Sequence, residues 1–308
     1  MNYLDDLTRN HPIRRTVAQK QVFIKDLLRL PACRRIGIRT ERTKDGKNQN
    51  IILGDPLHAK VVYTAHYDTP AAALFPNIMI PRNQVLFLLV QLLPVLLLVG
   101  IALAFSYLIS AAFDFDSTVL LVSFLILYYS LYYLLYRAFT NRNNRNDNTS
   151  GVATVLALAE QLQDDRLGGV AFILFDNEEK GKKGSKAYMK DHSEEMKDRL
   201  LINFDCVGNG ENILFIAMPQ AEKRAEFQRL QEQFVSNEAY HVYFYPIKGS
   251  ESNSDYKNFP CGIGCMACKK SKRGVFYTPR IHTRYDVVSN AENIDFIVAS
   301  MLRFLREL

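Results

Sequence analysis

Two long uncharged stretches interrupt this chain of 308 residues and constrain its fold more than any other feature. No charged residue occurs between Asn83 and Phe113, and none occurs between Ser117 and Tyr136. Each stretch meets or exceeds the about 20 apolar residues that a helix needs to cross a bilayer. Only residues 114–116, a short acidic turn, separate the two stretches. The sequence therefore predicts a hairpin of two membrane-spanning helices.

The alternative interpretation is a pair of buried core helices, which would need a much larger soluble domain to cover them. Charges around the hairpin predict its orientation, because positive residues favour the cytoplasmic side. Arginines flank the base of the hairpin, at positions 82, 137, 142 and 145, whereas only aspartates lie at its tip. We therefore expect a two-span protein of the cell membrane, with both termini and the soluble part in the cytoplasm. Five tyrosines at the end of the second stretch are typical of an interfacial aromatic belt: Tyr128, Tyr129, Tyr132, Tyr133 and Tyr136.

Outside the hairpin, strand-like and helical segments alternate. Residues 14–30 have helical periodicity up to Pro31, and strands are expected around 35–42 and 50–53. The β-branched run before His66 is typical of a buried parallel strand. After residue 146, helical and strand-like segments alternate up to a final helix over 293–308. This pattern predicts an α/β fold with a mostly parallel, mixed sheet and helices on both faces.

Composition argues against two classes of protein. The formal net charge is +6, but the basic residues are scattered or lie beside the apolar stretches, so they form no single basic face and we expect no nucleic-acid partner. The five cysteines are an odd number, and the N-terminus lacks the pattern of a secretory signal, so we expect no disulfide framework. Three of the cysteines lie on one strand-like segment and are expected to be buried, reduced thiols: Cys261, Cys265 and Cys268.

Side chains that bind metals stand where the apolar strand-like segments end. In open α/β sheets, the loops at the carboxyl ends of the strands converge on one crevice. Imidazole and carboxylate groups together suit zinc, with cobalt or manganese as substitutes. We therefore expect one metal site built from the residues of these types: His66 and Asp68 in VVYTAHYD, Asp147 in NDNTSG, Glu178 and Glu179 in VAFILFDNEE, Asp205 in LLINFD and His282 in RIHTRYD.

The order of these motifs resembles that of the co-catalytic zinc exopeptidases, the family of bacterial leucyl aminopeptidases and glutamate carboxypeptidase. Glutaminyl cyclases and the transferrin-receptor ectodomain are relatives of the same family. The resemblance covers residues 12–70 and 144–308. It implies a zinc-exopeptidase fold in which the catalytic domain consists of residues 1–82 and 141–308, and residues 83–140 form a transmembrane insertion in contact with the lipid bilayer.

The resemblance also implies how the metals are held. His66 and Asp205 would bind one Zn²⁺, Glu179 and His282 would bind the other, and Asp147 would bridge the two. Two zinc ions lower the pKa of a shared water and polarise the scissile carbonyl. A peptide is the implied substrate.

Two neighbours of these ligands receive supporting roles from the resemblance. Glu178 would be the general base that takes a proton from the water and passes it to the leaving amine. Asp68 would form a hydrogen bond to His66 and so select its tautomer. The peptide bond between Asp147 and Asn148 is expected to be cis, as it commonly is in the family.

Weaker candidates lie in two other segments. SDYKNFPCGIG is similar to the family segment that shapes the substrate pocket, which places Ser254, Asp255 and Tyr256 near the cleft; the alternative is a helix cap and turn. Family members often carry an aromatic hydroxyl near the last histidine to stabilise the oxyanion. Here Ile281 precedes His282, so Tyr277 and Tyr285 are the candidates for that role.

Together these features predict a membrane-anchored, two-zinc exopeptidase, with aminopeptidase activity favoured. A carboxypeptidase and a glutaminyl-cyclase-like acyltransferase with one zinc are alternatives on the same fold, and retention of both His66 and Asp205 favours two metals. A non-catalytic membrane receptor or scaffold is the alternative from a different class. Because the hairpin lies between Asp68 and Asp147 in the sequence, we expect its two ends beside the metal site, and the active site to open near the inner leaflet.

Overall fold

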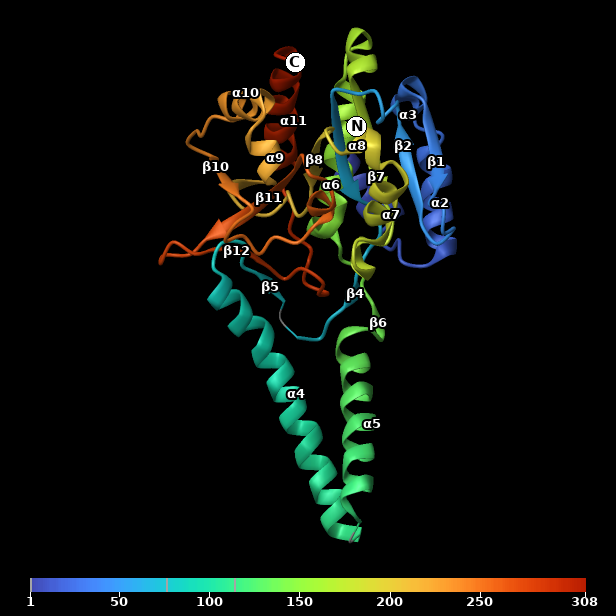
Figure 1. The fold of residues 1–308 in the computed structure, drawn as a ribbon, viewed down its shortest axis with the longest axis vertical. Helices are drawn as coiled ribbons and strands as arrows, with labels where there is room; N and C mark the ends of the chain where they lie inside the picture. Colours follow the sequence, from blue (N-terminus) through green and yellow to red (C-terminus); the bar gives the residue numbers. More distant parts are fainter. Residues whose placement is uncertain (1, 76, 114) are drawn as a thin grey trace.

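The computed structural model describes residues 2–75, 77–113 and 115–308. An α/β domain carries a helical hairpin that projects from one end of it (Figure 1). Asp114, which the sequence places in the turn of the hairpin, lies outside the described residues, as does Pro76 in the loop that leads into it. Both termini lie in the α/β domain, at the end away from the hairpin tip.

A mixed sheet of ten strands forms the centre of the domain, in the order β1-β2-β7-β3-β8-β11-β12-β5, with β9 paired to both β10 and β11. The central strands β7, β3, β8 and β11 are parallel to one another, whereas β1, β2, β12 and β5 pair antiparallel. The strand bounds are Ile38–Arg42 (β1), Gln49–Leu53 (β2), Val61–His66 (β3), Ala71–Ala72 (β4), Ile78–Met79 (β5), Phe139–Thr140 (β6), Val170–Phe175 (β7), Leu200–Phe204 (β8), Asn212–Ala217 (β9), His241–Pro246 (β10), Gly262–Lys270 (β11) and Phe276–Pro279 (β12).

Helices cover both faces of the sheet, as predicted. One apolar cluster joins the sheet to α1, α2, α6, α10 and α11, and a second cluster joins the opposite face to α7 and α8. The helix bounds are Tyr3–Asn10 (α1), Val17–Leu27 (α2), Pro31–Ile36 (α3), Gln84–Phe113 (α4), Ser117–Tyr136 (α5), Gly151–Gln161 (α6), Lys183–Asp191 (α7), Ser193–Met196 (α8), Pro219–Glu222 (α9), Ala225–Gln233 (α10) and Ala291–Arg306 (α11).

Local sequence explains most of these elements. Every residue of β3, β7, β8 and β9 is buried, which is why these strands are continuous apolar runs. The sequence pattern did not predict β9 or the short strand β12. It was also wrong at residues 35 and 36, because Pro31 occupies the first turn of α3 and the helix continues to Ile36. All five cysteines are buried and free, in agreement with the expected reduced thiols.

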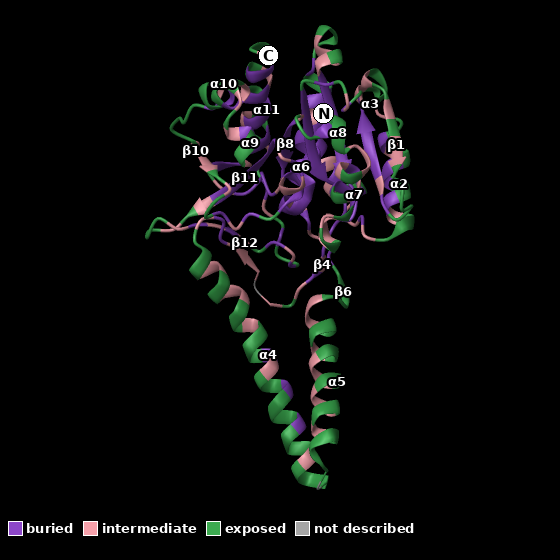
Figure 2. Cartoon of the chain, viewed as in Figure 1, coloured by how far each residue is buried: buried purple, intermediate pink, exposed green. Residues whose placement is uncertain are grey.

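The hairpin consists of α4 and α5, which approach each other at the tip and diverge towards the domain (Figure 1). Both are long and apolar enough to cross a membrane. Their surfaces are mostly exposed (Figure 2); on α4 the buried residues are Leu98, Ala102 and Ser106, which share one face, and no residue of α5 is buried. The Asp116 side chain caps α5 by accepting hydrogen bonds from the N–H groups of Thr118 and Val119.

Both ends of the hairpin are attached to the domain by main-chain pairing. β4 before the hairpin pairs with β6 after it, and β5 pairs with β12 of the domain. Leu74 donates its N–H to the Leu135 carbonyl at 2.8 Å. The Arg82 guanidinium lies 4.2 Å from the ring centroid of Tyr245. These contacts place the base of the hairpin beside the edge of the sheet that ends in β12 and β5.

The tight packing of β11 against the segment before it gives a test of the fold. A Cβ added at Gly264 would lie 2.5 Å from the ring of Tyr256, which is fully buried. We expect Gly264→Ala to destabilise the protein by about 1–3 kcal/mol through overpacking. Circular dichroism of the detergent-solubilised chain should show a lower melting temperature. Gly168→Ala is the matched control, because nothing lies within 4 Å of its added Cβ; equal melting of both variants would contradict the packing argument.

Candidate metal centre

The carboxyl ends of β3 and β8 bring the first group of predicted residues together. His66 is the last residue of β3, and Asp205 follows β8 directly. The Nε2 atom of His66 lies 3.4 Å from Oδ1 of Asp147 and 3.8 Å from Oδ1 of Asp205. The candidate ligand atoms of these three side chains all lie within 4.8 Å of one another, which is compatible with one shared cation.

A second group shares Asp147 with the first. The Nε2 atom of His282 lies 2.9 Å from Oδ2 of Asp147 and 3.4 Å from Oε2 of Glu179. The ligand atoms of this group also lie within 4.8 Å of one another. Asp147 therefore turns one carboxylate oxygen towards His66 and the other towards His282, so two cation positions would lie next to each other.

Glu178 lies beside both groups, and Asp68 positions it. A third set of atoms within 4.8 Å comprises His66, Glu178 and Glu179. The Asp68 carboxylate accepts the main-chain N–H of Glu178 at 2.9 Å and that of Glu179 at 3.3 Å. It therefore orders the turn that carries both glutamates.

The contact of Asp68 with His66 differs in detail from the expectation. The Nδ1 atom of His66 lies 3.1 Å from the main-chain oxygen of Asp68 and 3.6 Å from its Oδ1. The carboxylate is directed mainly to the two N–H groups of the glutamate turn, so the carbonyl is the nearer partner of the ring. Either oxygen would keep a proton on Nδ1 and leave Nε2 free to bind a cation.

Burial and crowding of like charges shift the pKa values of this cluster. Burial raises the pKa of Glu178 well above its usual range, and burial together with Asp147 raises the pKa of Glu179 to about 8. Burial lowers the pKa of His282, but Glu179 and Asp147 outweigh it and raise that pKa to about 10. The cluster therefore attracts positive charge strongly.

The residues fit zinc. Within the part of the chain that the structure describes, Oε1 of Glu179 is buried without a hydrogen-bond partner, although a buried carboxylate oxygen normally has one. Two imidazoles (His66 and His282) and two carboxylates (Asp205 and Glu179) lie around the shared Asp147, and this mixture of nitrogen and oxygen donors suits zinc. A bound cation would satisfy the orphan oxygen and offset the negative charge.

Asp286 is a supporting residue that the sequence reading missed. Its buried carboxylate accepts the N–H of Asn146 at 3.1 Å and that of Asp147 at 2.9 Å. Burial and the nearby Asp147 carboxylate raise its pKa to about 8. Asp286 ends the RIHTRYD segment that contains His282, and no local signal distinguishes it from the other charged residues of that segment.

The turn that carries Asp147 is held by side chain to main chain hydrogen bonds. The Asp147–Asn148 peptide bond is cis, as the resemblance implies. The Asn148 side chain donates to the Phe204 carbonyl at 2.9 Å and accepts from the N–H of Gly151 and of Cys206. A Cβ at Gly151 would lie 2.4 Å from the Phe204 oxygen, so only glycine fits there.

Arg14 connects two segments of the site, and the sequence analysis did not identify it. This arginine is fully buried, and burial lowers its pKa to about 10. Its Nε donates to the carbonyl of Tyr67 at 2.5 Å, and its Nη2 donates to the hydroxyl of Thr149 at 3.1 Å. It thereby joins the segment after β3 to the turn after the hairpin. No sequence motif marks such a residue, because its role depends on contacts across the fold.

A cleft of about 400 Å³ opens over the cluster. Ser254 and Tyr256 line it, as predicted, whereas Asp255 lies buried behind it and accepts the Ser185 hydroxyl at 2.5 Å. The two tyrosines considered for oxyanion stabilisation, at positions 277 and 285, are not among the residues that line the cleft. Phe87 and Gln91, from the first turns of α4, do line it, so the hairpin forms one wall.

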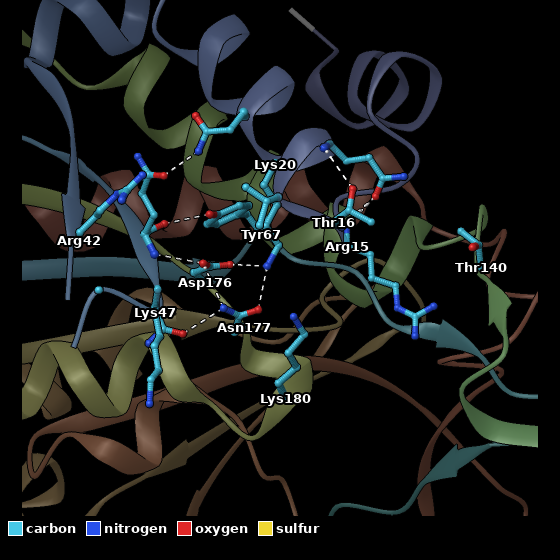
Figure 3. Close-up of a pocket in the computed structure, with 16 residues that line it drawn as sticks. Arg15, Thr16, Lys20, Arg42, Lys47, Tyr67, Thr140, Asp176, Asn177 and Lys180 are labelled. Carbon is cyan, nitrogen blue, oxygen red and sulfur yellow. Dashed lines mark hydrogen bonds and ion pairs between the residues drawn. The ribbon is translucent and has the colours of Figure 1, made fainter. Parts of the chain in front are cut away.

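Another cavity, of about 690 Å³, is lined by Asp176, Asn177 and Lys180, next to the glutamate turn, and none of the predicted site residues lines it (Figure 3). In it, the buried Lys20 ammonium contacts Oδ1 of Asp176 at 2.5 Å and Oδ1 of Asn177 at 2.9 Å. Asp176 and Asn177 immediately precede Glu178. This buried pair therefore supports the turn from behind.

The family model of peptidase family M28 matches residues 142–302, just over half of the chain. The chain therefore belongs to peptidase family M28 and is a zinc-dependent, peptidase-like enzyme. The matched segment contains five of the site residues but neither His66 nor Asp68, which only the fold brings to the cluster. Among curated proteins no significant sequence match is found.

Solved structures with the same fold include an aminopeptidase and two glutaminyl cyclases. The LapA aminopeptidase of Legionella pneumophila is 14% identical, with a TM-score of 0.56, over 99% of this chain and 69% of that one. The glutaminyl cyclase of Porphyromonas gingivalis is 16% identical, with a TM-score of 0.57, over 99% of this chain and 96% of that one. The glutaminyl cyclase of Fimbriiglobus ruber is 13% identical, with a TM-score of 0.51, over 99% of this chain and 93% of that one. These similarities show that the chain shares the fold of these proteins.

Removal of Asp286 should weaken metal binding. Asp286→Ala leaves the N–H groups of Asn146 and Asp147 without their acceptor, so the shared ligand loses its orientation. We expect zinc affinity to fall about 10–100-fold, the usual effect of removing a partner behind the ligands. Zinc titration of metal-stripped protein measures it. The exposed Asp165 provides the control variant, Asp165→Ala; the same affinity in both variants would show that Asp286 does not position the ligand.

Proposed function

We propose that this protein is a membrane-anchored exopeptidase that uses two zinc ions to remove N-terminal residues from peptides. The observation that carries the proposal is the position of Asp147, whose Oδ1 lies 3.4 Å from His66 and whose Oδ2 lies 2.9 Å from His282. A carboxylate that turns its two oxygens towards different imidazoles is suited to hold two neighbouring cations.

In this proposal, His66 and Asp205 would hold one zinc, Glu179 and His282 would hold the other, and Asp147 would be a ligand shared by the two groups. Zinc held by these residues would lower the pKa of a bound water and polarise the scissile carbonyl. The five side chains come from five separate segments: the end of β3, the turn before α6, the turn after β7, the residue after β8 and the segment before α11. The folded domain therefore preorganises the set.

Glu178 acts in the proposal as the general base and acid. Its pKa lies above the usual range because the side chain is buried, and a raised carboxyl pKa favours proton transfer near neutral pH. It takes a proton from the attacking water and delivers it to the leaving amine. Asp68 keeps Glu178 in place through the N–H bond at 2.9 Å.

The charges in the cleft favour an aminopeptidase over a carboxypeptidase. Among the described residues that line the cleft, four carry carboxylates (Asp147, Glu178, Glu179 and Asp205) and none is an arginine, so the cleft is negatively charged. Arginine is the usual partner of a carboxylate, because its two parallel N–H groups match it. The lining lysine, Lys182, already donates to Asn253. A substrate amine is therefore the better electrostatic match.

Membrane anchoring by residues 83–140, between catalytic parts 1–82 and 141–308, is the second element of the proposal. A core helix of a soluble protein is mostly buried, whereas α4 has only the three buried residues named above and α5 has none. Water is a poor solvent for so much exposed apolar surface. Arg82 and Arg137 stand at the base and Asp116 at the tip, so the positive-inside rule places the domain in the cytoplasm.

Glu178→Gln tests the proposed chemistry. The variant keeps the shape of the side chain but cannot accept a proton, so kcat/KM on a panel of aminoacyl fluorogenic substrates should fall about 10²–10⁴-fold. Its zinc content by mass spectrometry should be unchanged, and a chelator should abolish wild-type turnover. Glu194→Gln, at an exposed glutamate, is the control and should keep full activity.

The panel should include a peptide with N-terminal glutamine. Glu178-dependent release of ammonia from that peptide, without hydrolysis of the aminoacyl substrates, would favour the glutaminyl-cyclase alternative. Equal activity of wild type and Glu178→Gln would argue against catalysis at this site.

Cysteine labelling tests the topology without background, because the five native cysteines are buried. Phe115→Cys at the tip should react with a membrane-impermeant maleimide in intact cells, since the tip is expected outside. Lys272→Cys, on the turn between β11 and β12, should react only after lysis. The reverse pattern would place the catalytic domain outside, and labelling of both positions in intact cells would argue against a spanning hairpin.

A further inference from the structure

The cavity of about 690 Å³ beside the glutamate turn is lined mainly by polar and basic residues (Figure 3). Five of the residues that line it carry a positive charge: Arg15, Lys20, Arg42, Lys47 and Lys180. Asp176 is the only carboxylate among the described residues that line it. We call this space the basic cavity. Its charge is opposite to that of the cleft above the metal cluster, so it suits a different ligand.

The carboxylate of Asp176 is already neutralised within the protein. Its Oδ1 lies 2.5 Å from the buried ammonium of Lys20, and its Oδ2 accepts the N–H of Gln49 at 3.0 Å and the Asn177 side chain at 3.2 Å. This pair therefore adds little net charge to the basic cavity.

Four cations of the basic cavity have no carboxylate partner in the described part of the chain. Arg42, Lys47 and Lys180 are exposed, and their side chains form no hydrogen bond or ion pair with the described residues. Arg15 contacts a main-chain carbonyl. Figure 3 shows that these four side chains come from different segments around the space. An anion that entered it would meet positive charge on several sides.

The basic cavity lies at the base of the hairpin, on the side of α5. Thr140, the last residue of the hairpin segment, lines it. Arg15 donates from Nη2 to the carbonyl of Arg137, which caps α5, at 3.0 Å. The tyrosines that precede Arg137 are typical of the membrane interface. Because the polar headgroup layer extends about 5–8 Å beyond the hydrocarbon core, Arg15 would be within reach of its phosphates.

The lining of the basic cavity defines the chemistry of its ligand. Guanidinium and ammonium groups bind phosphate oxygens through charge-assisted hydrogen bonds. Side-chain amides can exchange hydrogen bonds with hydroxyl groups, and five of them line the space: Gln19, Gln21, Asn48, Gln49 and Asn177. Val17 is the only aliphatic side chain among the described residues of the lining. A polar ligand that carries a phosphate and hydroxyl groups therefore fits.

A nucleotide fits less well. Tyr67 is the only aromatic side chain among the described residues that line the basic cavity. It is fully buried, and its hydroxyl donates to the Gln49 carbonyl at 2.8 Å. No exposed ring is thus available to stack on a base, which is the usual support for nucleobases in such sites.

We propose that the basic cavity binds the phosphate-bearing headgroup of an anionic phospholipid of the inner leaflet, whose acyl chains lie in the bilayer beside α5. The inference rests on the proposed function, because it takes the hairpin to span the membrane with the domain on the cytoplasmic side, where the leaflet is negatively charged. A headgroup bound there would join the start of α2, the loop between β1 and β2 and the glutamate turn at the membrane surface.

Native mass spectrometry of the full chain, purified with zinc in a neutral detergent, tests the proposal. The wild type should retain phosphatidylglycerol with about 10-fold higher affinity than phosphatidylcholine of the same acyl chains. Arg42→Gln combined with Lys47→Gln should lower the affinity for phosphatidylglycerol about 10–30-fold, since each basic residue near an anionic surface contributes about fivefold. Lys25→Gln combined with Lys223→Gln removes two exposed charges outside the cavity and is the matched control.

A single variant guards against misfolding of the double variant. Lys47→Gln should lower the affinity for phosphatidylglycerol about fivefold. Without lipid, both cavity variants should melt at the wild-type temperature, because the two side chains have no hydrogen-bond or ion-pair partner among the described residues. Equal lipid affinity of the cavity variants and the control overturns the proposal, because the retained lipid would then only surround the hairpin. Equal retention of the two lipids by the wild type overturns it as well.

Competition distinguishes a lipid from a soluble phosphate compound. Short-chain dihexanoyl phosphatidylglycerol should displace the long-chain lipid, whereas glycerol phosphate should do so only at much higher concentration, because it lacks the acyl chains. Equal displacement by both compounds would assign the basic cavity to a soluble phosphate compound and overturn the lipid assignment.

The measurement in detergent also separates this inference from the proposed function, because it requires neither peptide hydrolysis nor a spanning hairpin. Loss of lipid in the cavity variants would support the cavity assignment even if no peptide is cleaved or if cysteine labelling contradicts the topology. Conversely, Glu178-dependent turnover with no cavity-dependent lipid binding would overturn this inference and leave the proposed function intact.

Discussion

The site depends on one carboxylate that faces two imidazoles. Asp147 lies 3.4 Å from His66 and 2.9 Å from His282, so its two carboxylate oxygens face different histidines. Its position is determined from two sides, because Asp286 accepts its N–H and the Asn148 side chain ties the same turn to the Phe204 carbonyl at the end of β8. The turn after the hairpin is thereby joined to the loop before α11 and to the centre of the sheet. Loss of any one of these contacts would disturb both candidate metal positions at once.

The hairpin is inserted between the two segments of the domain that carry Asp68 and Asp147. The hairpin segment, residues 83–140, begins 15 residues after Asp68 and ends seven residues before Asp147, and β4 and β6 pair across the gap. Residues at its entry also hydrogen-bond to the loop of His282. Helices that only tether an enzyme need no hydrogen bonds to the loops that carry its candidate metal ligands. Here the first turns of α4 form part of the cleft wall, so the hairpin and the catalytic part share one boundary.

Much of the fold and most of the cluster could be predicted from the sequence, because both depend on local signals. Buried strands are continuous apolar runs, and the residues after them must meet at one edge of a parallel sheet, which is how His66 and Asp205 were found. Arg14 and Asp286 could not be found in this way. Their importance comes from contacts with segments more than a hundred residues away, and nothing in their own neighbourhood distinguishes them from ordinary surface charges.

By itself the sequence determined that the chain has two apolar stretches long enough to span a bilayer within an α/β domain, and that acidic and imidazole side chains stand at its strand ends, because hydrophobic runs and residue types are properties of the chain. Only the tertiary structure decided which oxygen of Asp147 faces which histidine, that the Asp68 carboxylate is directed to the glutamate turn, and that Gln91 of α4 lines the cleft. These are distances between segments remote in sequence. They follow from how the sheet, the turn after the hairpin and the hairpin base pack together.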